Sequence, residues 1–324
     1  MDIRDRARSL LVWHVHGSWM ESLVAGKHRY IVPVNSAKDA EGRGVSGRNW
    51  PRAVEVSLDR LRDEDVDLVV LQRPEELDLT ERWLGRRPGV DVPAVYVEHN
   101  APRPSPVDSV HPLASRTDIE IVHVTDFNRL MWDNGTAPTR VIQHGIADPG
   151  YLYTGEVAGA ATMINEPLRR WRTVGTDLLF ELGASMPIDV WGIGTLELND
   201  CPHPGKVRGR GDVPSAQLMR QVARRRVYFH TARWTSLGLS LVEAMYLGMP
   251  VVAVASTMAP LVVPLESGVV SADMKTLTYA LQGFVTDFAA ASLAGKAARE
   301  FALAHFSLDR FLNQWDRVIE ERCR

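Results

Sequence analysis

The chain has 324 residues, of which 45% are hydrophobic and 24% charged, and its formal net charge at pH 7 is −3. This length exceeds that of a typical single domain, about 150 residues, and therefore predicts two domains. The composition is that of an ordinary globular protein. The nearly balanced charge provides no electrostatic drive toward nucleic acid or an anionic membrane, so we expect neither as a partner.

The cysteines and the first residues indicate a cellular compartment. Cys201 and Cys323 are far apart in the sequence and form no disulfide framework, which favours a reducing cytoplasm. Residues 1–17 carry charges followed by a short apolar run without a small-residue cleavage site, so we expect no signal peptide. Because no stretch reaches roughly 18 uncharged apolar residues, we also expect no membrane-spanning helix.

Short apolar runs bounded by turn residues recur along the chain, with helical patterns between several of them. They lie at residues 10–17, 66–74, 92–100, 119–126, 139–146, 187–194, 225–232 and 249–256. Such runs are typical of buried parallel strands, and their alternation with helices predicts an α/β fold. The stretch 147–161, which contains glycine and proline, is the expected linker, and residues 307–324 have apolar residues near helical spacing.

Residues at the carboxyl ends of these strands are candidates for function, since ligands bind there in parallel sheets. His16, Gly17 and Trp19 follow the first run, and His99 and Asn100 follow the third. Taken alone, a histidine in this position is more often structural than functional. Trp19 suits packing as well as it suits an acceptor pocket.

The sequence contains no convincing metal site. His14 and His16 share a strand face, and Cys201 stands two residues before His203, but neither pair supplies four ligands for zinc. The acidic stretch 63–67 has Asp-x-Asp spacing but precedes a strand, as a solvated acidic turn does. We therefore expect chemistry that needs no metal.

Two glycine pairs begin like a dinucleotide-binding fingerprint, in GIGTLE (192–197) and GRGDVP (209–214). Each lacks the third glycine, and neither opens the first strand–helix unit of the chain. Turn chemistry, in which glycine supplies a positive φ, explains them better than hydride transfer does.

A basic cluster, Arg169, Arg170 and Arg172, precedes Gly175, where a helix is expected to begin. A helix N-terminus beside guanidinium groups suits a diphosphate, because its amides and dipole favour anions and arginine binds two oxygens at once. A solvated basic turn accounts for the composition equally well.

Glu243 lies in a short predicted helix of otherwise apolar or small residues, within TSLGLSLVEAMYLGMPVVAV (235–254). One interpretation is a capping box, in which Glu243 returns to the amide of Ser240. The other is that its carboxylate accepts hydrogen bonds from a ribose diol, with Gly238 allowing the backbone to approach the ligand. The sequence pattern itself leaves both open.

This stretch resembles the nucleotide-sugar signature of the family-four-type glycosyltransferases, which have the GT-B fold. The matching residues are Gly238, Glu243-Ala244-Met245, Gly248 and Pro250-Val251-Val252. RVIQHGIADPG (140–150) and VYVEHN (95–100) are also similar to stretches of that family. The resemblance implies an α/β protein of GT-B architecture, with two doubly wound Rossmann-like domains facing across a cleft. It implies an acceptor domain over 1–150, a nucleotide-sugar domain over 151–306, and a helix in 307–324 that packs back on the first domain.

The resemblance also assigns roles to residues, with two departures. The ribose-binding glutamate falls on Glu243, but the family's first signature glutamate falls on Thr235, which carries no charge. The diphosphate-binding lysine falls on Val174, which leaves Arg170 or Arg172 to supply its charge. The implied donor-binding residues are Arg169, Arg170, Arg172, Gly192, Arg208, Ser236, Leu237, Gly238, Leu239 and Glu243. The implied acceptor-binding residues are His16, Gly17, Trp19 and Asn100, and the implied catalytic residues are His99 and Thr235.

The function implied is that of a cytoplasmic, retaining, metal-independent hexosyltransferase. It moves a sugar from a UDP- or GDP-linked donor to a small-molecule or glycan acceptor and needs no other cofactor. The departures at Thr235 and Val174 motivate an alternative, a sugar-nucleotide-binding protein with weak or no activity. A third interpretation, an epimerase of related fold, needs a carboxylate that works on the sugar, and only Glu98 is a candidate.

Overall fold

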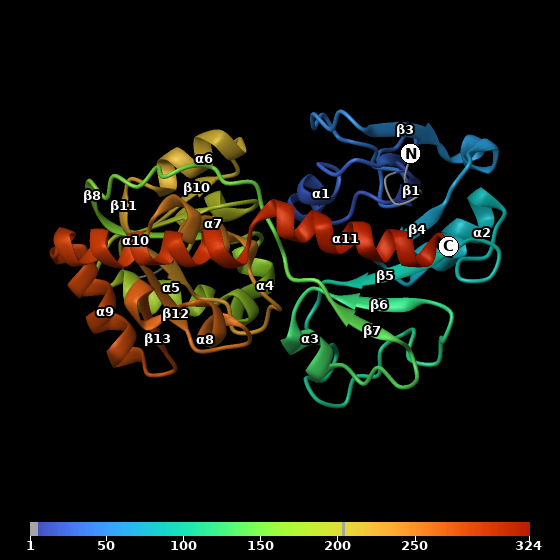
Figure 1. Cartoon of the computed structure of the whole chain (residues 1–324). Helices are drawn as coiled ribbons and strands as arrows, with labels where there is room; N and C mark the ends of the chain where they lie inside the picture. Colours follow the sequence, from blue (N-terminus) through green and yellow to red (C-terminus); the bar gives the residue numbers. More distant parts are fainter. Residues whose placement is uncertain (1–5, 203–204) are drawn as a thin grey trace. The chain divides into compact units, whose positions relative to one another are not determined.

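The computed structural model describes residues 6–202 and 205–324 (Figure 1). The chain forms two compact units, Met1–Ile146 together with Leu308–Arg324, and Ala147–Ser307. Each unit is built on one parallel sheet with helices, so the predicted α/β class with two doubly wound domains is confirmed. Within the described ranges, no helix combines the length and apolar character needed to cross a bilayer.

Unit 1 contains a seven-stranded parallel sheet of order β3-β2-β1-β4-β5-β6-β7. Its strands are β1 (Ser9–Val12), β2 (Arg29–Val34), β3 (Ala53–Ser57), β4 (Leu68–Leu71), β5 (Ala94–Glu98), β6 (Glu120–His123) and β7 (Thr139–Val141). Its helices are α1 (Gly17–Leu23), η2 (Leu58–Asp63), α2 (Glu75–Leu84), α3 (Asp126–Met131) and α11 (Leu308–Arg322). The strand order reverses between β1 and β4, which makes that pair the topological switch point of the sheet.

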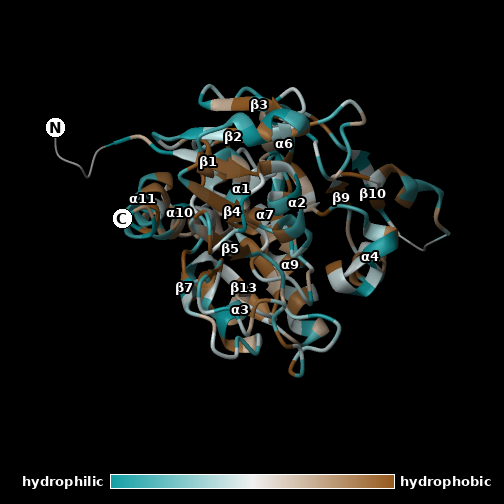
Figure 2. Ribbon diagram, turned by 90° about the vertical axis from the view of Figure 1, so that its right-hand side faces the viewer, coloured by the Kyte–Doolittle hydropathy of each residue, from teal (hydrophilic) through white to brown (hydrophobic). Residues whose placement is uncertain are grey.

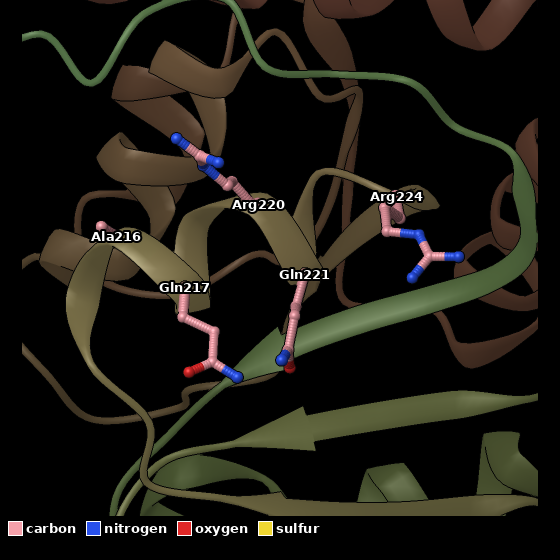
Figure 3. Close-up of a pocket in the computed structure, with 5 residues that line it drawn as sticks. All are labelled: Ala216, Gln217, Arg220, Gln221 and Arg224. Atoms are coloured by element: carbon pink, nitrogen blue, oxygen red, sulfur yellow. The ribbon is translucent and has the colours of Figure 1, made fainter.

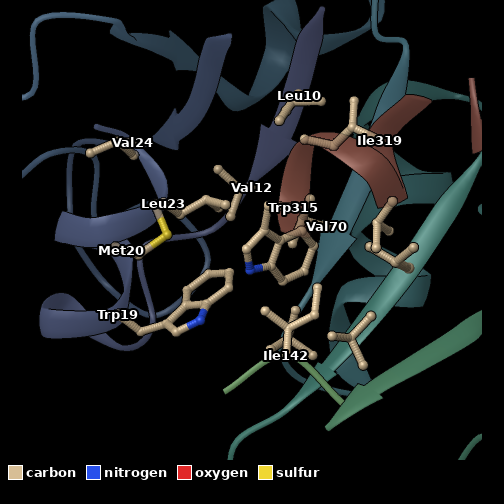
Figure 4. Close-up of a cluster of buried hydrophobic side chains, with 14 of the residues drawn as sticks. Leu10, Val12, Trp19, Met20, Leu23, Val24, Val70, Ile142, Trp315 and Ile319 are labelled. Carbon is tan, nitrogen blue, oxygen red and sulfur yellow. The ribbon is translucent and has the colours of Figure 1, made fainter. Parts of the chain in front are cut away.

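Two apolar cores cover the two faces of this sheet, because alternate residues of a strand point to opposite faces. Leu10 and Val12 of β1 belong to one core, and Leu11 belongs to the other. Helix α11 joins the first core through four buried residues, among them Trp315, which lies near Trp19 of α1 in Figure 4. The helix amphipathicity expected for residues 307–324 therefore serves to cover the sheet of unit 1. The other buried residues of α11 are Phe311, Val318 and Ile319.

Unit 2 contains a six-stranded parallel sheet of order β10-β9-β8-β11-β12-β13. Its strands are β8 (Val157–Met163), β9 (Ile188–Trp191), β10 (Val207–Gly211), β11 (Arg225–His230), β12 (Val251–Val254) and β13 (Gly268–Ser271). Its helices are α4 (Pro167–Val174), α5 (Thr176–Gly183), η3 (Thr195–Asp200), α6 (Ser215–Val222), α7 (Leu239–Leu247), α8 (Ala259–Val262), η4 (Leu265–Ser267), α9 (Met274–Thr286) and α10 (Phe288–His305). Here the switch point lies between β8 and β11.

Five strands, β2, β3, β8, β10 and β13, were not among the predicted runs. The edge strands β3 and β10 keep some side chains exposed, and β10 is made only of valine, glycine and arginine. Strand β8 consists largely of alanine and glycine and occupies part of the expected linker 147–161, so that linker is shorter than predicted. Hydrophobic colour concentrates on the strands in Figure 2, whereas α2 and α11 carry much hydrophilic colour. Three of the five missed strands, β3, β10 and β13, lie at sheet edges, whereas β2 and β8 are interior strands.

Candidate functional site

The switch point of unit 2 brings together charged residues from α4, from α5 and from the loop after β11. Arg233, three residues after β11, donates from Nη1 to Oδ1 of Asp177 at 2.7 Å and from Nη2 to Oδ2 at 2.9 Å. Arg172 donates from Nη1 to Oδ2 of the same carboxylate at 2.8 Å. Asp177 is in the first turn of α5, which begins at Thr176 as predicted. One carboxylate thus holds two guanidinium groups at the carboxyl edge of the sheet, where ligands bind in such folds.

The C-terminal end of α4 is also hydrogen-bonded to the loop after β11. Thr231 donates from Oγ1 to the carbonyl oxygen of Val174 at 2.5 Å, and the Arg233 amide donates to the carbonyl of Thr173 at 2.9 Å. Gly175 has a φ of 77°, and a Cβ there would lie 2.2 Å from the carbonyl oxygen of Thr231. Glycine is therefore required at residue 175, both for its backbone conformation and for this close approach.

The predicted basic cluster is only partly assembled here. Arg172 joins Asp177, whereas Arg169 forms an ion pair with Glu166 and its side chain is 69% exposed. Val174 is 3% exposed, so the position of the missing lysine faces the core. Arg233, which the sequence analysis did not identify, is less exposed than Arg169 and Arg172, since its side chain is 27% exposed and makes three hydrogen bonds. Its place just beyond the predicted strand 225–232 was the signal that could have identified it.

Glu243 lies in the second turn of α7 and does not form a capping box. The helix begins at Leu239, its N-cap is Gly238, and no side chain caps it. The hydroxyl of Ser240 accepts a hydrogen bond from Tyr228 of β11 at 2.9 Å. Glu243 forms no hydrogen bond or ion pair with any residue in the described part of the chain. The capping interpretation is therefore wrong.

The electrostatics of Glu243 point to a missing partner. Burial among apolar neighbours raises the pKa of its carboxyl group to about 7. A carboxylate that has lost water without gaining hydrogen bonds is costly, so such groups are concentrated at functional sites. The side chain remains partly accessible, and it can accept hydrogen bonds from a ligand.

The loop before α7 combines buried and accessible residues. Ser236 and Leu237 are 2% and 7% exposed, whereas Thr235, Gly238 and Leu239 are partly accessible. A Cβ at residue 238 would lie 2.8 Å from Cε1 of His230. Two further predicted donor residues belong to the part of the sheet on the other side of β8. They are Gly192, whose φ is 131°, after β9, and the exposed Arg208 on β10.

Histidines gather at the carboxyl edge of unit 1. The rings of His16 and His99 lie 4.1 Å apart between centroids, and Trp19 meets His99 edge-on at 5.0 Å. Burial lowers the pKa of His16 and of His144 to about 4, and that of His99 well below its usual range. The three rings are therefore neutral at pH 7. Trp19 is 2% exposed, which favours packing over contact with an acceptor.

Glu98, at the end of β5, is committed to structure. Its Oε1 accepts from the amide of Asn100 at 2.6 Å, and its Oε2 lies 3.2 Å from Nε2 of His111. His111 accepts from the amide of Leu113 through Nδ1, so Nε2 carries the proton donated to Glu98. Both carboxylate oxygens are occupied, which removes the carboxylate that an epimerase interpretation needed.

Two further features, a possible metal cluster and a surface hollow, were compared with the positions of these residues. Within residues 6–202 and 205–324, no group of three or more His, Cys, Asp or Glu side chains is arranged to hold a metal ion. The proposed pair Cys201–His203 includes His203, which lies outside the described residues. A hollow of about 420 Å³ opens beside α6 (Figure 3) and involves none of the predicted site residues. It is lined by Ala216, Gln217, Arg220, Gln221 and Arg224.

Comparisons with known proteins identify the fold and a family match in unit 2. Residues 201–298, which include Arg233 and Glu243, match the family described as "Glycosyl transferases group 1". HepE of Anabaena, solved with UDP, has a TM-score of 0.70 at 13% identity, covering 97% of this chain and 100% of HepE. The fold is GT-B. The predicted resemblance to GT-B glycosyltransferases is thereby confirmed.

Other solved glycosyltransferases share this GT-B fold. Sucrose-phosphate synthase of Thermosynechococcus elongatus has a TM-score of 0.70 at 14% identity, with 97% of this chain and 98% of that chain covered. TarM has a TM-score of 0.63 at 14% identity, with 78% of this chain covered. The match spans only 54% of the TarM chain. No curated protein matches the chain in sequence.

Proposed function

We propose that the protein is a retaining glycosyltransferase that moves a hexosyl group from a UDP- or GDP-linked sugar to a hydroxyl acceptor. The observation that carries this proposal is Glu243, a half-buried carboxylate without a partner in the described structure, within the stretch that matches the family. A ribose diol supplies the two hydroxyl donors that such a carboxylate lacks. The UDP and UDP-glucose in the titles of HepE structures support a UDP-linked donor.

In the proposed mechanism, each residue has a binding role. Arg172 and Arg233 stabilise the diphosphate as the bond between the anomeric carbon and its oxygen breaks. Glu243 fixes the ribose and so positions that carbon. The acceptor oxygen attacks on the face that the diphosphate leaves, and its proton passes to the leaving group. We assign His99 to a sugar hydroxyl, since the ring is neutral and its buried Nε2 has no partner among the described residues.

No metal and no cofactor beyond the sugar nucleotide take part in this proposal, since the paired arginines supply the positive charge that the diphosphate requires. Two unpaired cysteines suit the reducing cytoplasm in which we place the reaction. The second candidate, a sugar-nucleotide-binding protein without activity, is favoured by the uncharged Thr235 and the buried Val174.

Thermal shift with UDP-, GDP-, ADP- and dTDP-sugars tests the proposal, because a ligand that binds only the native state raises its apparent stability. We expect one nucleotide to raise the melting temperature, and its sugar to be released or transferred, in buffer containing EDTA. Binding without release or transfer across an acceptor panel would support the inactive alternative. Loss of activity with EDTA and its recovery with manganese would contradict metal independence. Absence of any nucleotide binding would overturn both candidates.

A further inference from the structure

The last residue of β11 is a buried histidine without a partner. His230 is 6% exposed, and neither of its ring nitrogens forms a hydrogen bond with a residue in the described part of the chain. Neither nitrogen is completely enclosed, so each keeps surface that a ligand can reach. Burial lowers the pKa of the ring to about 4, so at pH 7 it is neutral and has one N–H to donate. A buried donor in this state is costly unless a ligand or water bonds to it.

The ring lies against the N-terminus of α7, a helix of nine residues. A Cβ on Gly238, the N-cap residue, would lie 2.8 Å from Cε1 of His230 and 3.7 Å from Nδ1. The amides of Leu239 and Ser240 form no hydrogen bond within the described chain, and the first turn contains no acidic residue. Free amides at a helix N-terminus attract anions. The imidazole and the two amides are therefore neighbouring donors without acceptors.

The same segment lies beside the position where the family resemblance places a lysine. Thr231, the next residue, donates from Oγ1 to the carbonyl oxygen of Val174 at 2.5 Å. Val174 is buried and supplies no side-chain donor. Arg172 and Arg233 both bond Asp177, so this carboxylate offsets one of the two positive charges. A diphosphate carries more negative charge than the remainder, so a further donor at this edge of the sheet would stabilise it.

We propose that His230 binds the diphosphate of the sugar nucleotide, with its ring N–H donating to a phosphate oxygen in place of the ammonium group that residue 174 lacks. The identity of the ligand rests on the proposed glycosyl transfer, whereas anion binding by His230 and the α7 amides does not. Because the ring is neutral, it stabilises the departing diphosphate without adding charge to the free protein. The hydrogen bond goes to the phosphates, so its contribution should be absent from the binding of a nucleoside.

Packing is the other role open to a buried histidine, and it predicts different behaviour. The ring of His230 stacks on that of Tyr228, with 6.4 Å between centroids and 28° between planes. His230→Leu keeps an apolar side chain of similar volume but removes both nitrogens. If the histidine only packs, this change should lower the melting temperature or leave ligand binding unaltered. If it binds a phosphate, the free protein should melt no earlier, because no hydrogen bond within the described chain is lost.

The first experiment measures UDP and uridine affinity by calorimetry at about pH 8, where the imidazole is neutral. His230→Leu should weaken UDP binding roughly tenfold, the loss expected for one hydrogen bond to a charged group, and leave uridine binding unchanged. His230→Gln and His230→Asn keep an N–H donor, so at least one of them should retain most of the UDP affinity. His305→Leu is the matched control, because His305 is exposed at the end of α10. Unchanged UDP affinity in His230→Leu, or equal losses for UDP and uridine, would overturn the proposal.

The second experiment uses the wild-type protein and inorganic pyrophosphate, which contains no nucleoside. Pyrophosphate should bind and should shift the ring nitrogen NMR resonances of His230, assigned by their absence from His230→Gln, whereas uridine should not shift them. Pyrophosphate binding that leaves these resonances unchanged, or no pyrophosphate binding, would refute the assignment. If pyrophosphate binds at His230 but no nucleotide binds, the proposed function fails and the anion site stands. If UDP binds to His230→Leu with full affinity, the proposed function stands and this inference fails.

Discussion

The two units share one plan, yet their switch points carry different chemistry. In unit 2, Asp177 fixes Arg172 and Arg233 beside the loop that leads to Glu243. In unit 1, the corresponding edge carries neutral histidines, with Arg48 and Arg73 on its rim. Parallel sheets of similar topology thus place ligands at the same edge, while the loops decide which ligands they are.

The two units also differ in how their arginine side chains are held in place. The guanidinium groups of unit 2 are fixed in advance by a shared carboxylate, as is expected of groups that must stabilise a charge developing during a reaction. The arginines of unit 1 are instead paired one to one, Arg48 with Glu21 and Arg73 with Glu76. The two edges therefore differ in how many arginines one carboxylate holds.

The largest effect is expected in the core of unit 1. Trp315→Ala removes a side chain that is 1% exposed and should lower the free energy of unfolding by about 3–5 kcal/mol. The cores of the two units share no residue, so UDP should still raise the melting temperature of folded unit 2. Denaturant unfolding with and without UDP measures both. Asn313→Ala is the control, because Asn313 is exposed on the same helix. If Trp315→Ala abolished UDP binding as well as lowering the free energy of unfolding, the two units would not be independent.

Glu243→Gln comes next. Two charge-assisted hydrogen bonds to the ribose are lost, at about 1.5–3 kcal/mol, so UDP affinity should fall roughly ten- to a hundredfold. The melting temperature of the free protein should not fall, because no bond within the described structure is lost. Removing the 2′-hydroxyl from the ligand should reduce its affinity less for the variant than for the wild type, because both changes remove the same interaction. The exposed Glu266→Gln serves as control, and a variant that melts earlier but binds UDP normally would disprove the ribose role.

Arg233→Gln distinguishes the fixed arginines of unit 2 from ordinary surface charge. UDP binding should weaken by about five- to thirtyfold, or about 1–2 kcal/mol, while uridine binding changes little. Arg169→Gln is the matched comparison, since that side chain is 69% exposed and pairs with Glu166, and we expect a smaller loss. Calorimetry with both ligands measures the ratio. Equal losses for UDP and uridine would remove Arg233 from the diphosphate site.

The smallest effect is a pH dependence of UDP affinity set by Glu243. Its pKa in the free protein is about 7, and the ribose hydroxyls need the ionised form, so binding should release protons and strengthen as pH rises toward 7. The slope should approach, at most, about tenfold per pH unit below the pKa. The effect of this group on the free energy of unfolding has the opposite sign, because the folded protein favours the protonated carboxyl. Its contribution to stability is fully present below the unfolded pKa of about 4.5 and is lost as pH rises through about 7. Glu243→Gln should flatten both profiles, and an unchanged UDP profile would contradict the assignment.

Much of the fold could be predicted because buried parallel strands leave continuous apolar runs. Strands β4, β5, β6, β11 and β12 were recognised in this way. The weaker signals belong to β8, whose alanines and glycine allow close packing, and to edge strand β10. The site was only partly predictable, because Arg233 acquires its meaning from Asp177, 56 residues earlier in the chain.

The sequence by itself determined the α/β class, the position of the helix that carries Glu243, and the family resemblance. These depend on local patterns: apolar runs, the stop at Gly248 and the order of residues in one stretch.

Only the tertiary structure decided which groups are partners. It showed that Ser240 is bonded to Tyr228 and that Glu243 is left without a partner in the described chain. It paired Arg233 with Asp177 across the β8–β11 switch point, and it placed Arg48 over Gly17. Hydrogen bonds and desolvation depend on distances between segments far apart in sequence, and no local pattern specifies those distances.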